Sequence, residues 1–166
     1  MNNKTILRLR LFLLMLAFGN FTICFSQTGI SVTPPRIYFE LSNGQTRTEK
    51  VTVTNVSAKN TLDLSVTLGD WEYNEFGDNL MYMADTLKNS CAGWVNINNF
   101  SYISLKPGES KTIDVSLTVP SDLDETEPVH TAMLYVTQMN PIDDIDKEGT
   151  NIKVNIRSGI KIFYRT

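Results

Sequence analysis

Hydrophobic and polar residues alternate along most of this 166-residue chain from about residue 29 onward. A period of two is typical of β-strands that bury one face, and no stretch has a convincing helical period. Turn-forming residues separate the alternating stretches, and their number and spacing predict an all-β fold, a seven-stranded immunoglobulin-like Greek-key β-sandwich. The expected strands lie within residues 29–40, 47–56, 61–71, 79–84, 94–105, 111–119, 129–139 and 151–166.

Two interruptions inside these stretches carry further expectations. Pro34 and Pro35 divide the first strand, and proline cannot donate to a ladder, so this strand lies at an edge or changes sheets there. In the last strand, Ser158 and Gly159 mark the expected border between a buried end near Ile160 and an upstream end. Between the last two strands, residues 142–150 are expected to form a polar loop.

The first 26 residues have the pattern of a secretory signal peptide. Basic residues precede a short apolar run over residues 11–18, and small residues precede a cut after Ser26. We therefore predict a signal peptide over 1–26, a domain over 27–166 and export to the periplasm. A retained membrane anchor and a lipid anchor on Cys24 are the alternatives. The short run disfavours the first, and the bulky residues of Phe21-Thr22-Ile23 disfavour the second.

Charge and cysteine content indicate which classes of partner are disfavoured and which interactions stabilise the fold. The net charge is −3, and removal of residues 1–26, which contain no acidic residue, makes the domain more acidic. This excludes the clustered positive charge with which proteins bind nucleic acid or anionic membranes. Cys91 is then the one remaining cysteine, so no internal disulfide is expected and packing has to stabilise the fold.

The sequence contains no pattern of catalytic or metal-binding residues. His130 is the single histidine, and we expect it at a sheet edge or loop mouth, because no second ligand has metal-binding spacing. Asp143, Asp144 and Asp146 resemble part of a calcium loop, but no terminal glutamate follows at the spacing that such a loop requires. No nucleophile elbow or phosphate-binding loop is present. We therefore expect no enzyme activity, no metal and no cofactor.

The chain ends on its most regular strand. Ile152, Val154 and Ile156 alternate with polar residues, and the pattern resumes at Ile160. Alternating aliphatic residues usually face their own core, which is one interpretation. The other is that the end near Ile160 is buried while the end near Ile152 pairs with another protein through an exposed edge.

Three segments together resemble the N-terminal domain of the PapD-like periplasmic pilus-assembly chaperones. They are PPRIYFE with Arg36, TLDLSVTLGDW ending at Trp71, and GIKIFYR with Lys161, and the resemblance covers about residues 29–165. It implies a chaperone that caps pilus or surface-fibre subunits by lending its last strand. Arg36 and Lys161 would hold the subunit's terminal carboxylate, and Ile152, Val154 and Ile156 would fill its groove.

The sequence departs from that family at its end. Family members carry a second domain, whereas Arg165 is followed here only by Thr166. A truncated product, a single-domain relative and a partner that supplies the missing domain are the three explanations. The expected partners are pilin-like or other secreted β-sandwich subunits. The alternative function is a secreted structural or adhesive immunoglobulin-like module without a client.

Overall fold

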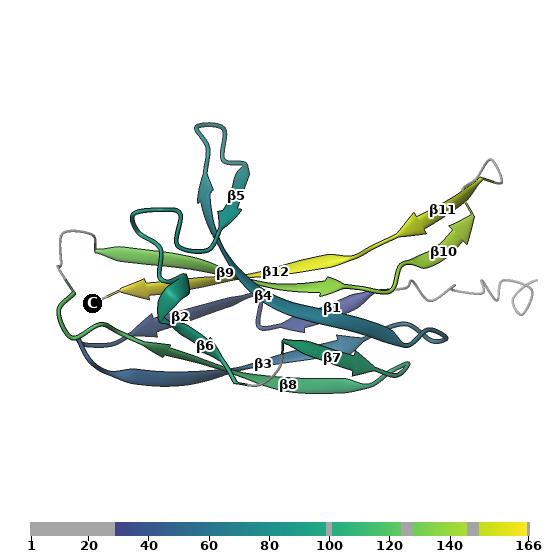
Figure 1. The fold of residues 1–166 in the computed structure, drawn as a ribbon, viewed down its shortest axis with the longest axis horizontal. Coiled ribbons are helices and arrows are strands. Elements are labelled where there is room, and N and C mark those ends of the chain that lie inside the picture. The colour runs from purple at the N-terminus through teal and green to yellow at the C-terminus, as the bar shows by residue number, and fades with distance from the viewer. Residues whose placement is uncertain (1–28, 99–100, 124–127, 146–149, 166) are drawn as a thin grey trace, which may run out of the picture.

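The computed structural model describes residues 29–98, 101–123, 128–145 and 150–165. The predicted signal peptide, residues 1–26, lies outside this part of the chain. The described residues form twelve strands and one short 3-10 helix, η1 at Ala92–Trp94 (Figure 1). The strands are β1 Ile30–Thr33, β2 Arg36–Glu40, β3 Thr46–Asn55, β4 Leu62–Tyr73, β5 Asn79–Met83, β6 Val95–Ile97, β7 Tyr102–Leu105, β8 Ser110–Thr118, β9 Val129–Gln138, β10 Ile142–Ile145, β11 Asn151–Val154 and β12 Arg157–Arg165.

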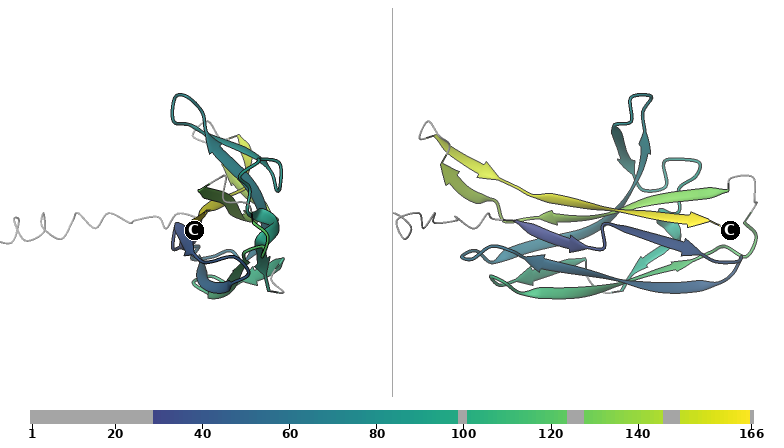
Figure 2. Two further views of the ribbon diagram at one scale, coloured as in Figure 1. Left: turned by 90° about the vertical axis from the view of Figure 1, so that its left-hand side faces the viewer. Right: turned by 180° about the vertical axis from the view of Figure 1, so that it is seen from behind.

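The strands form two packed sheets and one projecting pair. The smaller sheet has the order β1-β3-β8-β6, and the larger has the order β2-β12-β9-β4-β5, with β7 also paired to β4. Strands β10 and β11 pair only with each other. The two sheets lie one above the other in Figures 1 and 2, so the predicted immunoglobulin-like β-sandwich is confirmed.

The prolines divide the first predicted strand between the two sheets. Ahead of them β1 pairs antiparallel with β3, whereas β2, which follows them, pairs parallel with β12. The Thr33–Pro34 peptide bond is cis. The expectation that this strand changes sheets at the prolines is confirmed, and the change brings Arg36 beside the last strand of the chain.

The core lies between the sheets and follows the predicted alternation. Leu62, Leu64 and Val66 of β4 are almost fully buried, as are Ile160 and Ile162 of β12. Aliphatic side chains from both sheets surround them, and Tyr164 also belongs to this cluster. Cys91 is a free thiol. Close packing of the core side chains holds the larger sheet in place and so fixes the positions of the residues on its outer face.

Three details of the predicted strands are wrong. Residues 94–105 are not one strand, because η1 and β6 end near Ile97 and β7 pairs with the other sheet. The polar loop expected at residues 142–150 contains β10. The last strand is interrupted at residues 155–156 instead of at Ser158 and Gly159, which lie inside β12.

His130 is also placed differently from the prediction. It lies on β9, an interior strand of the larger sheet, and is only 5% exposed. Its ring packs between Trp94, at a centroid distance of 4.6 Å, and Tyr164, at 5.9 Å. The alternating pattern of residues 129–139 places it on a buried face, but the prediction gave more weight to the polarity of the imidazole ring.

No helix in the described part of the chain has the length and apolar character needed to cross a membrane.

Candidate functional site

Arg36 and Lys161 are partners in the parallel ladder between β2 and β12. Partners in neighbouring strands have Cα atoms about 5 Å apart and point to the same face of the sheet. That face is the outer face of the larger sheet, because the next residues on the two strands, Ile37 and Ile162, are buried in the core. Two residues 125 positions apart in the chain are thus neighbours, as the resemblance implied.

The ammonium group of Lys161 is held on this outer face by the turn end of the β4–β5 hairpin, where β4 ends and β5 begins. Its Nζ donates to the hydroxyl oxygen of Tyr73 at 2.8 Å and to Oδ1 of Asn79 at 2.7 Å. It also lies 3.7 Å from the centroid of the Trp71 ring. Cation–π contacts of this kind favour a cation over an aromatic face without neutralising its charge.

The local structure explains why these side chains converge. Tyr73 and Asn79 are partners in the β4–β5 ladder, so they project from the same face. Trp71 precedes Tyr73 by two residues and is fixed by a hydrogen bond from its Nε1 to the carbonyl oxygen of Ala132, at 3.0 Å. We call Arg36, Trp71, Tyr73, Asn79 and Lys161 the anchor cluster.

The anchor cluster contains two cations and no carboxylate. In the described part of the chain neither Arg36 nor Lys161 forms an ion pair, whereas Lys50 is paired with Asp114 and Arg165 with Glu40. Their field acts on the phenol: the hydrogen bond from Lys161 is the largest cause that lowers the pKa of Tyr73, and the charges of Lys161 and Arg36 lower it further. Such an arrangement suits an anion.

The edge of β12 that faces away from β9 has no paired strand just before Lys161. Residues 157–160 pair with β9 on one side, and β2 pairs with the other side only from Lys161 onward. Among the described residues no strand pairs with that second side of residues 157–160, although β1 packs near β12. The unpaired stretch, which we call the free edge, therefore ends where the two cations lie.

Upstream of the free edge, β10 and β11 form an arm that leaves the sandwich (Figures 1 and 2). Gln138 bonds to Ile156, and the next pair along the hairpin is Ile142 with Val154. Met139, Asn140 and Pro141 lie between these pairs on one strand, but only Asn155 on the other. Extra residues on one strand form a bulge, which bends the hairpin.

This bulge is fixed to the start of β4. The side chain of Asn140 accepts from the backbone N–H of Asp63 at 2.8 Å and donates to the carbonyl oxygen of Thr61 at 2.9 Å. The backbone N–H of Met139 donates to the carbonyl oxygen of Asp63 at 2.7 Å. The base of the arm is thus tied to the body of the protein.

The three predicted groove-filling residues lie along the arm and its junction with β12. Ile152 is 38% exposed and Val154 is 37% exposed, while Ile156 is half-buried. By contrast, Ile160 is 1% exposed and belongs to the core. Solvent access therefore decreases along the segment from the arm toward the sandwich.

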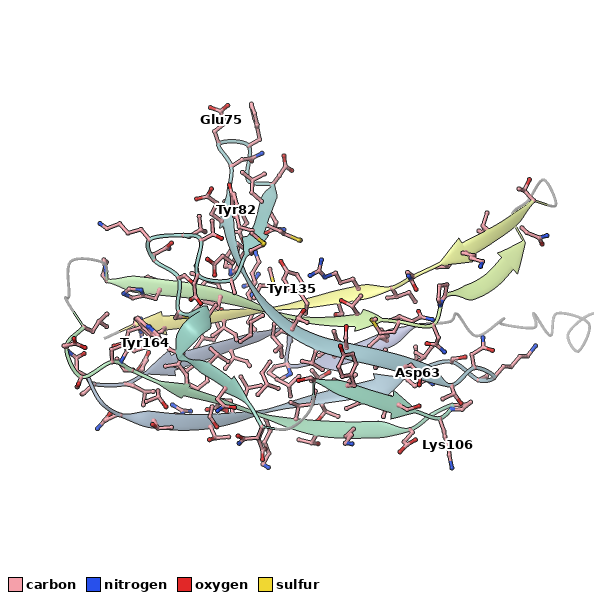
Figure 3. All side chains as sticks on the ribbon, viewed as in Figure 1. Asp63, Glu75, Tyr82, Lys106, Tyr135 and Tyr164 are labelled. Atoms are coloured by element: carbon pink, nitrogen blue, oxygen red, sulfur yellow. The ribbon has the colours of Figure 1, made fainter. Side chains whose placement is uncertain are left out.

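Aromatic side chains cover the outer face between the arm and the β4–β5 hairpin. Figure 3 labels Tyr135 in this position, whereas Tyr164 lies within the sandwich. The guanidinium of Arg157 lies 3.7 Å from the centroid of the Tyr135 ring. A third cation thus lies on the same face, beside the free edge.

Sequence reasoning missed Tyr73 and Asn79, and it interpreted Trp71 as a core residue and part of a family motif, with no role in binding. The alternation along β4 could have indicated the orientation of Trp71 and Tyr73. The even-numbered residues Leu62, Leu64, Val66 and Leu68 face the core, so the odd-numbered Trp71 and Tyr73 lie on the opposite, outer face of the sheet. Asn79 had no such signal, because its position depends on the register of the β4–β5 pair. No group of residues that could hold a metal ion occurs in the described part of the chain.

No protein-family model and no curated protein matches this chain. Several solved structures do. They include the class 5 fimbriae chaperone CfaA, with a TM-score of 0.54 and 16% identity over 81% of this chain and 55% of that one. The E. coli chaperone DraB matches with a TM-score of 0.51 and 13% identity, over 83% of this chain and 55% of that one. A complex of the Salmonella enterica SafA pilin with the SafB chaperone matches with a TM-score of 0.52 and 9% identity, over 86% of this chain and 56% of that one.

The fold is PapD-like. The match covers more than four fifths of this chain, although the sequences are 16% identical or less. The chain spans only slightly more than half the length of these chaperones. The likeness therefore concerns the architecture, and the function of this PapD-like chain has to be argued from its own site.

Proposed function

We propose that this chain is a periplasmic chaperone-type binding module, which pairs the free edge of β12 with a strand of a client subunit and holds the client's terminal carboxylate. The observation that carries the proposal is the position of two cations, Arg36 and Lys161, at the residue where the free edge ends. Neither forms an ion pair with another described residue. Neither catalysis nor a cofactor is part of it.

Backbone chemistry supports strand addition at the free edge. The unpaired side of residues 157–160 offers N–H and C=O groups that a foreign strand can bond, and the arm extends this edge toward Ile152. Ile152, Val154 and Ile156 would enter apolar pockets of the client. A register slip of one residue would offer Lys153 and Asn155 instead, so the register has to be fixed.

The position of β2 supports one direction for the client strand. Because β2 occupies the same edge of β12 from Lys161 onward, a strand added upstream has to stop near Lys161. A carboxylate at that point belongs to the C-terminal residue of the client. The client strand would therefore run parallel to β12, as β2 does, and charge-assisted bonds to its carboxylate would fix its register.

The energies require both parts of the site. Ile152 and Val154 are already more than half covered, so complete burial would contribute about 1 kcal/mol for each. Association itself costs several kcal/mol, on the order of 4 or more. Backbone hydrogen bonds and the carboxylate contacts of Arg36 and Lys161 therefore have to supply most of the affinity.

The class of client is proposed from the neighbours. CfaA, DraB and SafB are named as chaperones, and SafB was solved in complex with a pilin. Pilin-like or other secreted β-sandwich subunits are therefore the proposed clients, in the periplasm.

One observation favours the alternative, a secreted structural or adhesive module without a client. Lys161 already has two hydrogen-bond acceptors and an aromatic face, and these contacts alone would give it a structural role. Arg36 has no comparable contact in the described part of the chain. The two functions differ in whether a free C-terminus is recognised.

The test is affinity capture from a periplasmic extract with the full chain as bait, beside Lys161→Ala and the control Lys106→Ala. Lys106 is exposed in the turn between β7 and β8, so its removal changes the net charge equally without touching the anchor cluster or the arm. The captured polypeptide, identified by mass spectrometry, is then produced with its native C-terminus and with six residues added to it.

We expect the native form to bind the wild type and Lys106→Ala, and to bind Lys161→Ala at least tenfold more weakly, since a charged hydrogen bond is lost. The extended form should bind none of them well. Equal capture by wild type and Lys161→Ala, or equal binding of the extended polypeptide, would contradict the carboxylate anchor.

A further inference from the structure

Tyr73 has an unused hydrogen-bond donor beside the two cations. Its hydroxyl oxygen accepts a hydrogen bond from Lys161 Nζ at 2.8 Å, so its own hydrogen is left to bond to a different acceptor. No side chain or backbone group in the described residues accepts it. Tyr73 is 54% exposed, so a ligand on the outer face of the sheet can reach the hydroxyl.

Lys161 also has one donor left. An ammonium group carries three hydrogens, of which Tyr73 and Asn79 accept two. The remaining hydrogen of Lys161 and the hydroxyl hydrogen of Tyr73 are carried by atoms that lie 2.8 Å apart. Two donors this close together can bond to the two oxygens of a single carboxylate.

The phenol ring is well positioned by its neighbours. It packs edge-on against Trp71 at a centroid distance of 5.0 Å, and Asn79 is its partner across the ladder. Both cations influence its ionisation, which places the hydroxyl within electrostatic range of Arg36 as well as of Lys161. The hairpin thus brings a neutral donor to a site that sequence reasoning assigned to two cations alone.

We propose that Tyr73 is a third binding residue for the client's terminal carboxylate, donating its hydroxyl hydrogen while Arg36 and Lys161 supply the charge. This inference rests on the proposed function and adds a residue to its site. Three donors on one face select a group with only acceptors, because an amide would direct its own hydrogens toward Lys161 and Tyr73.

The test isolates the carboxylate from the rest of the client. N-acetylglycine carries a terminal carboxylate next to a peptide bond, and N-acetylglycinamide is its uncharged counterpart. Both are titrated into the full chain while amide and lysine resonances are followed by NMR. The variants are Tyr73→Phe, which keeps the ring, Lys161→Met, and the control Tyr102→Phe, an exposed tyrosine on β7.

We expect N-acetylglycine to shift resonances around Lys161 in the wild type and Tyr102→Phe, and to bind Tyr73→Phe about tenfold more weakly, while N-acetylglycinamide shifts none. Equal or tighter binding by Tyr73→Phe would overturn the role of Tyr73 and leave the two-cation anchor intact. Absence of binding to the wild type would overturn the anchor and this inference together.

Discussion

Lys161 lies opposite Arg36 in the β2–β12 ladder, yet its ammonium group is bonded to Tyr73 and Asn79 on the β4–β5 hairpin. The lysine therefore connects the last strand of the chain to a hairpin that is two strands away in the sheet. Two cations on one face repel each other, and the aromatic rings and neutral oxygens reduce that cost without supplying a countercharge. Among the described residues, no carboxylate forms an ion pair with either cation.

The first prediction concerns the ionisation of Tyr73. The hydrogen bond from Lys161 lowers the pKa of Tyr73, because a cationic donor stabilises the phenolate. Replacement Lys161→Met removes both this bond and the charge, so the pKa of Tyr73 should rise toward its ordinary value. Ultraviolet titration of the phenolate band, with Tyr73→Phe as the subtraction reference, measures it.

The matched control is Lys153→Met, which removes a lysine from the exposed arm and should leave the pKa of Tyr73 unchanged. Replacement Arg36→Gln should raise the pKa less than Lys161→Met does, since Arg36 acts only through its charge. An unchanged pKa in Lys161→Met would contradict the geometry of the anchor cluster.

The second prediction compares two isoleucines on the same terminal segment. Ile160 is 1% exposed in the core, so Ile160→Ala should lower the free energy of unfolding by about 3 kcal/mol. Ile152 is 38% exposed on the arm, so Ile152→Ala should lower it by less than about 1 kcal/mol. Urea denaturation of the two variants provides the measurement. A loss for Ile152→Ala as large as that for Ile160→Ala would show that the arm belongs to the folding core.

The sandwich could be predicted from sequence because its core follows the alternation directly. Leu62, Leu64, Val66 and Ile160 are buried as their parity requires. The change of sheet at Pro34 and Pro35 was also predictable, because proline cannot donate to a ladder. These features depend on local patterns, which a sequence displays.

The break in the last strand could not be predicted, because its cause is on another strand. Gly159 suggested a border, yet it continues β12: a Cβ atom there would lie 2.9 Å from Sδ of Met133. Glycine thus leaves room for the Met133 side chain on the outer face. The break comes instead from Met139, Asn140 and Pro141, the extra residues on the partner side of the hairpin.

The anchor cluster depends on register, which the sequence does not display. The pairing of Tyr73 with Asn79 is set by the hairpin turn between them, and the approach of Lys161 depends on the twist of the larger sheet. The family resemblance supplied Arg36 and Lys161. It did not supply the neutral side chains that position the lysine.

The third prediction concerns Cys91, which is completely buried. Burial, with smaller effects of Asp70 and Asp85, raises the pKa of Cys91 to about 12. The thiolate is the reactive form, so between pH 7 and pH 10 the folded protein should scarcely react with a disulfide reagent. In a Cys24→Ser chain, where Cys91 is the one thiol, the labelling rate should follow the fraction unfolded as urea is added. Rapid labelling at pH 8 without urea would show that the loop around Cys91 opens independently of global unfolding.

The fourth prediction concerns His130, a buried polar side chain in an aromatic setting. Neither Nδ1 nor Nε2 of His130 has a hydrogen-bond partner in the described part of the structure. Leaving buried polar groups unpaired costs about 1–3 kcal/mol relative to pairing them with water. Replacement His130→Phe keeps an aromatic ring between Trp94 and Tyr164 and removes both unpaired nitrogens. It should therefore raise the free energy of unfolding by about 1 kcal/mol, measured by urea denaturation at pH 8.

The control His130→Ala separates polarity from packing. It also removes the nitrogens, but it leaves a cavity beside Trp94 and Tyr164, so it should lower the free energy of unfolding by about 2 kcal/mol or more. Opposite signs for His130→Phe and His130→Ala would establish that the ring is needed for its shape alone. A loss of stability in His130→Phe comparable to that in His130→Ala would mean that the imidazole has a polar partner in solution. In that case the histidine stabilises the interior strand by hydrogen bonding and not by filling space.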